Sequence, residues 1–185
     1  MTNVGLALTI APDIVKNIEE IVLMGGGCYQ ANCTACAESN IWHDPEAAQA
    51  LLQSGAKVTI VPLDATHRAA LTKEHCKLLR AVGTPAADFA AEMAENRMVV
   101  YNQTQPLARP DLSPLHDPLC IAYLIDPEVL TDLRPVHCEV DCGDGAGQGQ
   151  TIVDPRYFTE ETNSYFAFDA DVDRFVSILC DVFRG

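Results

Sequence analysis

The sequence lacks the segments that would place the chain in a membrane or mark it for export. No apolar run is long enough to cross a bilayer, although 48% of the 185 residues are hydrophobic. The start, Met1-Thr2-Asn3, has no basic stretch ahead of an apolar one, so no secretory signal is predicted. A chain of this length buries one substantial core. We therefore expect a single domain, without a membrane partner, in the cytoplasm.

Basic residues are also scarce. The chain has 12 lysines and arginines against 26 aspartates and glutamates, which gives a formal net charge of −14. This balance argues against binding to phosphate backbones, so no nucleic-acid partner is expected, and it leaves acidic residues available for a hard cation. The glycine-rich stretch Gly143–Gly149 lacks the G-x-x-x-x-G-K-[ST] pattern of a phosphate-binding loop.

The eight cysteines do not form a complete zinc or disulfide pattern. Cys33 and Cys36 make a C-x-x-C, but a second such pair, or a histidine pair at finger spacing, is absent from the sequence. Without an export signal, a disulfide framework is not expected. Metal or redox use of Cys33 and Cys36 stays open as an alternative, and the other cysteines are interpreted as small apolar or incidental residues.

A strand, a glycine turn and a capped helix dominate the first third of the chain. The apolar run Ile21–Met24 predicts a strand, and Gly25–Gly27 follow it at once. Asp44 and Pro45 are typical of an N-cap and a first helical turn. The connection between strand and helix carries the polar residues Asn32, Glu38 and Asn40. In an open α/β sheet this is the carboxyl edge of a strand, where ligands bind.

Strand and helix signals alternate along the rest of the chain. We expect further strands at 57–63, 135–142, 151–153 and 164–168, and helices at 2–8, 12–20, 72–82, 85–101 and 119–125. A final amphipathic helix should follow an N-cap at Asp169. This alternation predicts an α/β fold with three layers, in which helices cover both faces of a mostly parallel sheet.

A proline-rich loop at 103–114 ends in Leu115-His116-Asp117-Pro118, which opens an apolar helix. Loops of this length are often functional lids. From spacing alone, Asp117 has a simpler interpretation as the N-cap of the helix, and His116 as a surface histidine.

Four blocks of the sequence together resemble one protein family. They are Leu23–Gly27, Ala37–Ala48, Leu63–His67 and Leu115–Pro118, and Thr2-Asn3-Val4 adds a match to the family's L-T-N segment. In this order they resemble the inosine–uridine preferring nucleoside hydrolases. The family's opening aspartate cluster, D-x-D-P-G-x-D-D, has no counterpart here. The chain therefore resembles the carboxyl-terminal part of such an enzyme, a single domain over 1–185 without the family's first βαβ units.

The resemblance implies a role for particular residues. Cleavage of an N-glycosidic bond requires stabilisation of a positive ribosyl centre, activation of water and help for the departing base. The family uses Ca²⁺, which takes six to eight oxygen ligands. By resemblance Asp117 is one ligand, and His116 occupies the position of a group that protonates a purine leaving group. The residues that match ribose-contacting positions are Met24, Asn32, Glu38 and Asn40.

Each assignment has an alternative based on spacing alone. Asn32 is also consistent with a turn residue, and Glu38 and Asn40 with solvated loop residues. Asp64 matches the family as well, and a structural hydrogen bond is its expected role. Because parallel strands present their carboxyl ends at one edge, we expect Glu38 and Asn40 to face the same cleft as Asp117.

Two functional hypotheses follow. The first is a ribonucleoside N-glycosidase acting on a small-molecule ribonucleoside, inactive as this chain alone because the matched metal ligands other than Asp117 are absent. The second is a non-catalytic binding or structural module derived from such an enzyme. In both cases we expect a homo-oligomer, since a sheet edge or apolar face without the upstream strands favours association. The sequence does not determine the preferred base.

Overall fold

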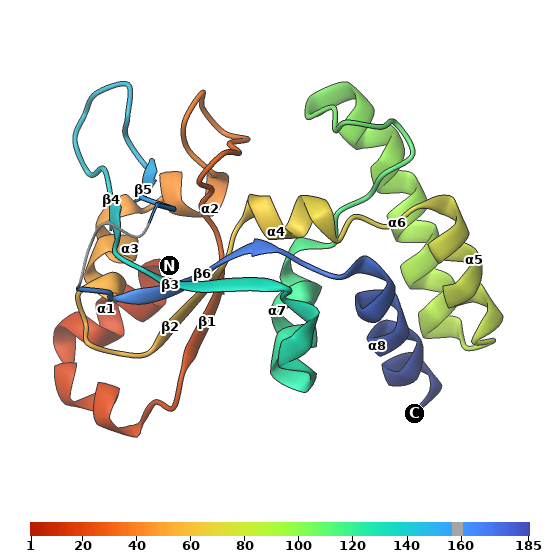
Figure 1. The fold of residues 1–185 in the computed structure, drawn as a ribbon, viewed down its shortest axis with the longest axis horizontal. Coiled ribbons are helices and arrows are strands. Elements are labelled where there is room, and N and C mark those ends of the chain that lie inside the picture. The colour runs from red at the N-terminus through yellow and green to blue at the C-terminus, as the bar shows by residue number, and fades with distance from the viewer. Residues whose placement is uncertain (157–160) are drawn as a thin grey trace. The chain divides into compact units, whose positions relative to one another are not determined.

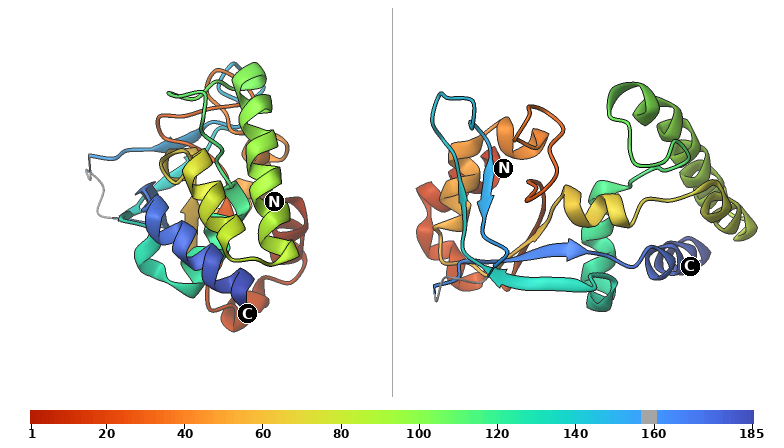
Figure 2. Two further views of the ribbon diagram at one scale, coloured as in Figure 1. Left: turned by 90° about the vertical axis from the view of Figure 1, so that its right-hand side faces the viewer. Right: turned by 45° about the horizontal axis from the view of Figure 1, so that its top comes forward.

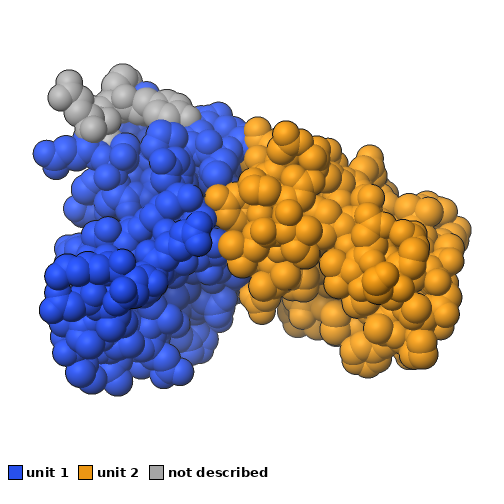
Figure 3. Space-filling model, turned by 90° about the horizontal axis from the view of Figure 1, so that it is seen from below, with its two compact units in different colours: residues 1–64, 132–168 blue, residues 65–131, 169–185 orange. Residues whose placement is uncertain are grey.

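The computed structural model describes residues 1–156 and 161–185. These residues form two compact units, each assembled from two separate stretches of the chain (Figure 3). The first unit comprises residues 1–64 and 132–168, and the second comprises residues 65–131 and 169–185.

The first unit contains the main sheet. Its strands, in spatial order, are β1 (Ile21–Met24), β2 (Val58–Val61), β6 (Ser164–Asp169) and β3 (Asp132–Val136) (Figure 1). β1 runs parallel to β2, with Ile21 opposite Val58, and β2 runs parallel to β6. All four residues of β2 are buried, as expected for a central strand of a parallel sheet. The predicted α/β fold with a mostly parallel sheet is confirmed.

Helices pack against this sheet within the first unit. They are α1 (Thr2–Ile10), the 3₁₀ helix η1 (Pro12–Asn17), α2 (Ser39–Trp42) and α3 (Pro45–Leu52). α3 begins where the sequence predicts, because the Asp44 carboxylate accepts a hydrogen bond of 3.1 Å from the Ala47 amide. α1 lies directly on α3: a Cβ atom on Gly5 would be 2.7 Å from the Ala47 Cβ. Glycine is therefore required for this close approach.

A second, two-stranded sheet also belongs to the first unit. β4 (Cys138–Val140) pairs antiparallel with β5 (Thr151–Val153). The single strand expected at 135–142 was therefore wrong, since the chain passes from β3 to β4 at His137. Asn163 explains the change: its side chain bonds both the amide and the carbonyl of Cys138, each at 2.8 Å. These bonds occupy the backbone of Cys138 and so end the run of β3.

The second unit is helical. Its elements are α4 (Leu63–Arg68, which starts in the first unit), α5 (Lys73–Ala81), α6 (Pro85–Thr104), α7 (His116–Ile125), the 3₁₀ helix η2 (Pro127–Val129) and α8 (Val172–Arg184). α5, α6 and α8 contact one another and lie side by side in both views of Figure 2. The Thr72 and Thr84 side chains are the N-caps of α5 and α6.

Two predicted caps in this unit were wrong. The cap of α8 is Asp171, whose carboxylate accepts from the Arg174 amide at 3.0 Å, and Asp169 is the last residue of β6. α7 begins at His116, so its N-cap is Leu115 and Asp117 lies inside the first turn.

Among the helices of the described residues, none combines the length and apolar character that a bilayer-crossing span requires.

Candidate functional site

The connection after β1 leaves the sheet through glycines that tolerate no side chain. Gly26 has a φ of +75°, and a Cβ atom there would lie 2.4 Å from the Thr151 hydroxyl oxygen. A Cβ atom on Gly27 would lie 2.0 Å from the carbonyl oxygen of Gln30. The loop therefore folds back tightly against the carboxyl end of β1. This geometry keeps the polar residues of the connection next to the sheet edge.

Glu38 closes this connection. Its side chain is buried, with 3% exposed, and its Oε2 accepts hydrogen bonds from the amides of Gly26 (2.9 Å), Asn40 (2.9 Å) and Ile41 (3.2 Å). Glu38 is thus the N-cap of α2, a helix that the sequence did not predict. Its other oxygen, Oε1, makes no hydrogen bond to the described residues. One carboxylate oxygen therefore holds the backbone while the second is left to accept from a ligand.

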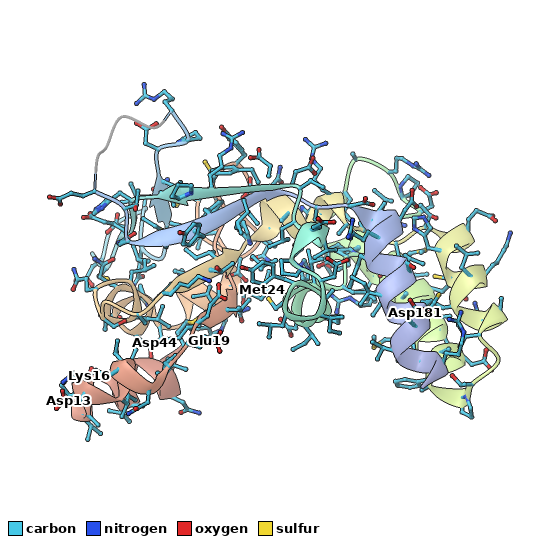
Figure 4. The ribbon with its side chains drawn as sticks, turned by 60° about the horizontal axis from the view of Figure 1, so that its bottom comes forward. Asp13, Lys16, Glu19, Met24, Asp44 and Asp181 are labelled. Carbon is cyan, nitrogen blue, oxygen red and sulfur yellow. The ribbon has the colours of Figure 1, made fainter. Side chains whose placement is uncertain are left out.

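Three other predicted ribose-contacting residues lie around Glu38. The Asn40 Nδ2 donates to the Met24 carbonyl oxygen at 3.2 Å and contacts the Met24 sulfur at 3.3 Å. The Asn32 Oδ1 accepts from the Ser39 amide at 2.9 Å, next to Glu38 in the chain. Met24, labelled in Figure 4, ends β1, and Asp44, also labelled there, precedes α3. The structure therefore brings Met24, Asn32, Glu38 and Asn40 together at one strand end.

Asp64 anchors the beginning of the same loop. It follows β2, is 7% exposed, and its carboxylate accepts from the amides of Cys28 (2.7 Å) and Tyr29 (2.9 Å). The structural hydrogen bond predicted for Asp64 is confirmed. Glu38 at one end of the connection and Asp64 at the other fix its backbone to the carboxyl edge of the sheet.

His116 lies in the second unit, where two hydroxyl groups hold its ring. Its Nδ1 is 2.8 Å from the Thr66 hydroxyl, and its Nε2 forms a very short hydrogen bond with the Tyr101 hydroxyl. Burial, with the nearby His67 and Arg97, lowers the pKa of His116 from 6.5 to about 3. The imidazole is therefore neutral at physiological pH, and the simpler interpretation as a surface histidine does not hold.

The Tyr101 hydroxyl links His116 to a cation. Arg97, one turn earlier on α6, donates from its Nη2 to the Tyr101 hydroxyl at 3.2 Å. Its guanidinium carbon also lies 5.1 Å from the centroid of the Tyr101 ring. The His67 ring centroid is 5.8 Å from that of His116, and burial lowers the pKa of His67 as well. The result is a hydrogen-bonded row from Arg97 through Tyr101 to His116.

Sequence reasoning did not identify Thr66, Arg97 or Tyr101. Thr66 lies within a matched block, but its 50-residue separation from His116 gives no local signal of contact. The one indication for Arg97 and Tyr101 is their spacing of four on a predicted helix, which places them on one helical face. Nothing in that spacing connects Tyr101 with His116 across the proline-rich loop.

Asp117 does not belong to a metal centre formed by the described residues. Its side chain is exposed in the first turn of α7. In neither stretch, 1–156 or 161–185, do three or more histidine, cysteine, aspartate or glutamate side chains gather as a group that could hold a metal ion. Because Ca²⁺ takes six to eight oxygen ligands, the residues present do not fit a calcium site. The expected place of Asp117 beside Glu38 stays a prediction.

The first unit has a mostly parallel sheet with a polar cluster at one strand end, and the second unit has a part-buried neutral histidine. The sheet and its helices define an α/β protein, a class in which ligands bind at the carboxyl ends of the strands. The sequence model described as "Inosine-uridine preferring nucleoside hydrolase" matches residues 1–177. The chain belongs to this family.

Curated relatives and solved structures agree with that assignment. The chain is 35% identical over 182 residues to the inosine-uridine preferring nucleoside hydrolase of Leishmania major, covering 98% of this chain and 56% of the relative. It is 37% identical over 181 residues to the pyrimidine-specific ribonucleoside hydrolase RihA of Escherichia coli O9:H4 strain HS, covering 97% and 57%. The purine-preferring ribonucleoside hydrolase of Gardnerella vaginalis has a similar structure, with a TM-score of 0.83, 34% identity and coverage of 99% and 58%. The chain thus spans little more than half the length of these relatives.

Proposed function

We propose that this chain carries the ribose-binding and leaving-group parts of a ribonucleoside N-glycosidase site, with a small-molecule ribonucleoside as its ligand. The observation that supports this most directly is the arrangement of Glu38. Its Oε2 is fully engaged by backbone amides, while Oε1 has no partner among the described residues. Beside it, the Asn40 amide is held by Met24. A carboxylate oxygen and an amide oxygen side by side suit the hydroxyl groups of a sugar.

The reaction breaks the C1′–N bond, joins a water oxygen to C1′ and sends the base away with a proton. His116 supports the last of these steps as a relay, because its low pKa prevents it from storing a proton at neutral pH. A proton given to the base from one ring nitrogen is replaced at the other by the proton of the Tyr101 hydroxyl. The tyrosinate that results lies beside Arg97 and is neutralised by the proton that the attacking water releases. Both ring nitrogens already bond to hydroxyls, so a base would displace one of them.

Calcium is proposed for the complete site, with Asp117 as the one candidate ligand in this chain. A single exposed carboxylate does not hold Ca²⁺ against water, and no further ligand group is found among the described residues. Catalysis is therefore expected only from a longer chain or with a complementing chain. For this chain alone, the same observation favours the second hypothesis, a non-catalytic module that retains the ribose-binding residues.

Binding tests the ribose-binding residues without requiring catalysis. We expect ribose, inosine and uridine to shift the side-chain amide signals of Asn32 and Asn40 in NMR titrations, with Kd values of about 1 mM, equivalent to about −4 kcal/mol. Asn40→Ala should weaken binding about tenfold. Asn102→Ala is the matched control. Asn102 lies in the second unit, away from Asn40 in the sequence, and its Nδ2 likewise donates to a backbone carbonyl, that of Pro110. Equal affinity in the two variants would contradict the assignment of Asn40.

Turnover tests the expected inactivity of this chain by itself. The chain is incubated with inosine or uridine and Ca²⁺, and release of free base is followed. We expect no turnover near the ~1 s⁻¹ or more that is typical of enzymes. Turnover at that rate, abolished by Asp117→Ala, would show that the chain assembles a complete site and would reject the non-catalytic module.

A further inference from the structure

The loop that holds Asn32 and Glu38 also carries the C-x-x-C pair, which the proposed function does not use. Cys33 is exposed and Cys36 is partly buried, and both are free thiols. Neither belongs to a group of three ligands that could hold a metal ion among the described residues. Thiol chemistry of the pair itself is the remaining possibility.

Hydrogen bonds to the Ala37 carbonyl and to the Thr34 hydroxyl fold this segment back on itself. The Ala37 carbonyl oxygen accepts from the amides of Asn32 (3.3 Å), Cys33 (3.0 Å) and Thr34 (3.3 Å). The Thr34 hydroxyl accepts in turn from the amides of Cys36 (3.3 Å) and Ala37 (3.0 Å). These bonds hold Cys33 and Cys36, three positions apart, within one folded segment that ends at Ala37. A disulfide needs Cα atoms about 4.4–6.8 Å apart, a separation that residues three positions apart reach when the backbone bends back on itself.

The Cys36 thiol connects this segment to a second loop. Its Sγ donates to the Ala146 carbonyl oxygen at 3.0 Å, within the glycine-rich stretch Gly143–Gly149. One residue further on, Ala37 forms an isolated antiparallel bridge with Gln150. The proton of the reduced thiol is what makes the Sγ–Ala146 bond. A disulfide sulfur has no proton to donate, so oxidation of Cys36 must remove this connection.

The six other cysteines are poorly suited to the same chemistry. Burial raises the pKa of Cys28 to about 11 and those of Cys120 and Cys138 to about 12. Burial also raises the pKa of Cys76, Cys142 and Cys180. Because the thiolate is the nucleophile in disulfide exchange, these groups react slowly at neutral pH. The exposed Cys33 is the natural point of attack.

We propose that Cys33 and Cys36 form a reversible disulfide by exchange with a small-molecule disulfide, and that this oxidation releases the 143–149 loop from the loop that carries Asn32 and Glu38. The Cys33 thiolate attacks one sulfur of the small disulfide and expels the first small thiolate. Cys36 then attacks the Cys33 sulfur of the mixed disulfide and expels the second. The two protein thiol protons end on the two released thiols, and the two electrons reduce the small disulfide.

Mass spectrometry tests the bond. The full chain is incubated with oxidised glutathione, free thiols are alkylated, and peptides are mapped. We expect a Cys33–Cys36 disulfide that dithiothreitol reverses. Cys36→Ser should instead keep glutathione on Cys33. Cys180→Ser is the matched control, because it removes a partly buried thiol from α8 and should oxidise like the parent chain. Glutathione adducts without a Cys33–Cys36 bond in the parent chain, or pairing of either residue with Cys28 or Cys142, would overturn the proposal.

Hydrogen exchange tests the consequence. The amides of Gln148 and Gly149 bond to the carbonyls of Gly145 and Asp141, so their exchange reports on the order of the glycine-rich loop. Oxidation should speed their exchange about fivefold, the factor that one hydrogen bond of ordinary strength represents. Cys36→Ala, which removes the donor without forming a disulfide, should produce a similar increase in its reduced state. Unchanged exchange in both cases would overturn the proposed release.

Discussion

At the scale of the single residue, the contact between Gly26 and Thr151 shows how closely the site is packed. Gly26 adopts a φ of +75°, and the Thr151 side chain fills the space in which a Cβ atom would stand. The Thr151 hydroxyl is buried and has no hydrogen-bond partner among the described residues. Thr151 therefore serves here as a packing group against the glycine, at the cost of an unsatisfied polar atom.

Gly26→Ala should lower the free energy of unfolding by about 3 kcal/mol, because it combines left-handed backbone strain with a clash against Thr151. Gly55→Ala is the matched control. Gly55 has a similar φ of +80°, but nothing lies within 4 Å of the Cβ position. Its substitution should cost only about 1 kcal/mol. Urea denaturation measures both, and equal losses would show that the Thr151 contact contributes nothing.

The lowered pKa of His116 predicts that the stability of the folded chain depends on pH. The pKa of His116 is about 3 in the folded chain, against 6.5 for a histidine in water, which represents the unfolded chain. Between these two pH values the unfolded chain therefore binds more protons than the folded chain. The free energy of unfolding should therefore fall on acidification from about pH 6.5 towards 3, by at most about 1.4 kcal/mol per pH unit from this group.

Urea denaturation across this range, in the parent chain and in His116→Gln, isolates the contribution of His116. The variant should lose less stability on acidification, because it has no imidazole to protonate. A parallel profile for His116→Gln and the parent would contradict the part-buried, neutral state of His116.

At the scale of the element, α2 depends on a side chain outside it. A helix of four residues has no appreciable stability of its own. Glu38 supplies what is missing, because its Oε2 bonds two amides of the first turn and also the Gly26 amide at the other end of the connection. The same contact that starts α2 therefore holds the loop closed. Order in α2 and order in the proposed ribose-binding residues should be lost together.

Glu38→Ala should reduce the free energy of unfolding by about 3 kcal/mol, since three bonds to one buried carboxylate are lost. Asp44→Ala offers a matched comparison at the N-cap of the next helix. Asp44 accepts one amide bond, from Ala47, together with a short bond from the Thr2 hydroxyl, and its loss should cost about 1 kcal/mol. Chemical denaturation measures the free energy of unfolding of both variants. A larger loss of that free energy in Asp44→Ala than in Glu38→Ala would contradict the central role of Glu38.

At the scale of the whole molecule, two surface properties oppose each other. The net charge of −14 disfavours association of identical chains. Large apolar side chains nevertheless lie exposed on one face of α7: Ile121 and Leu124 are each 59% exposed, and Ile125 is 56% exposed. Their spacing of three and four residues makes them one continuous apolar stripe. β1 adds an edge strand without charge or proline, paired with β2.

We propose that the chain self-associates through the apolar stripe of α7 formed by Ile121, Leu124 and Ile125. Salt should promote this association because it screens the net negative charge. Light scattering should show a mass above that of the monomer, and the mass should rise with protein and salt concentration. Leu124→Lys should reduce association. Leu78→Lys, at a residue of α5 with 54% exposure, should leave it unchanged. A strict monomer under all these conditions would contradict the proposal.

The sequence by itself determined much of this protein because many of its signals are local. The strand at Ile21–Met24, the Asp44 cap of α3 and a helix over 72–82 were predicted from patterns among neighbouring residues. The family blocks also identified the residues that gather around Glu38. Such features depend on backbone propensity and nearby hydrogen bonds, which a sequence pattern records directly.

Only the tertiary structure decided the features that depend on distant partners. The division of the strand expected at 135–142 follows from Asn163, which bonds to Cys138 across 25 residues. The neutral state of His116 follows from burial and from the nearby His67 and Arg97, which are 49 and 19 positions away in the sequence. Even the carboxylate of Glu38 acquires its role from the Gly26 amide, 12 positions earlier. A pKa or a strand end depends on which groups the folded chain brings into contact, and residue order alone does not specify those contacts.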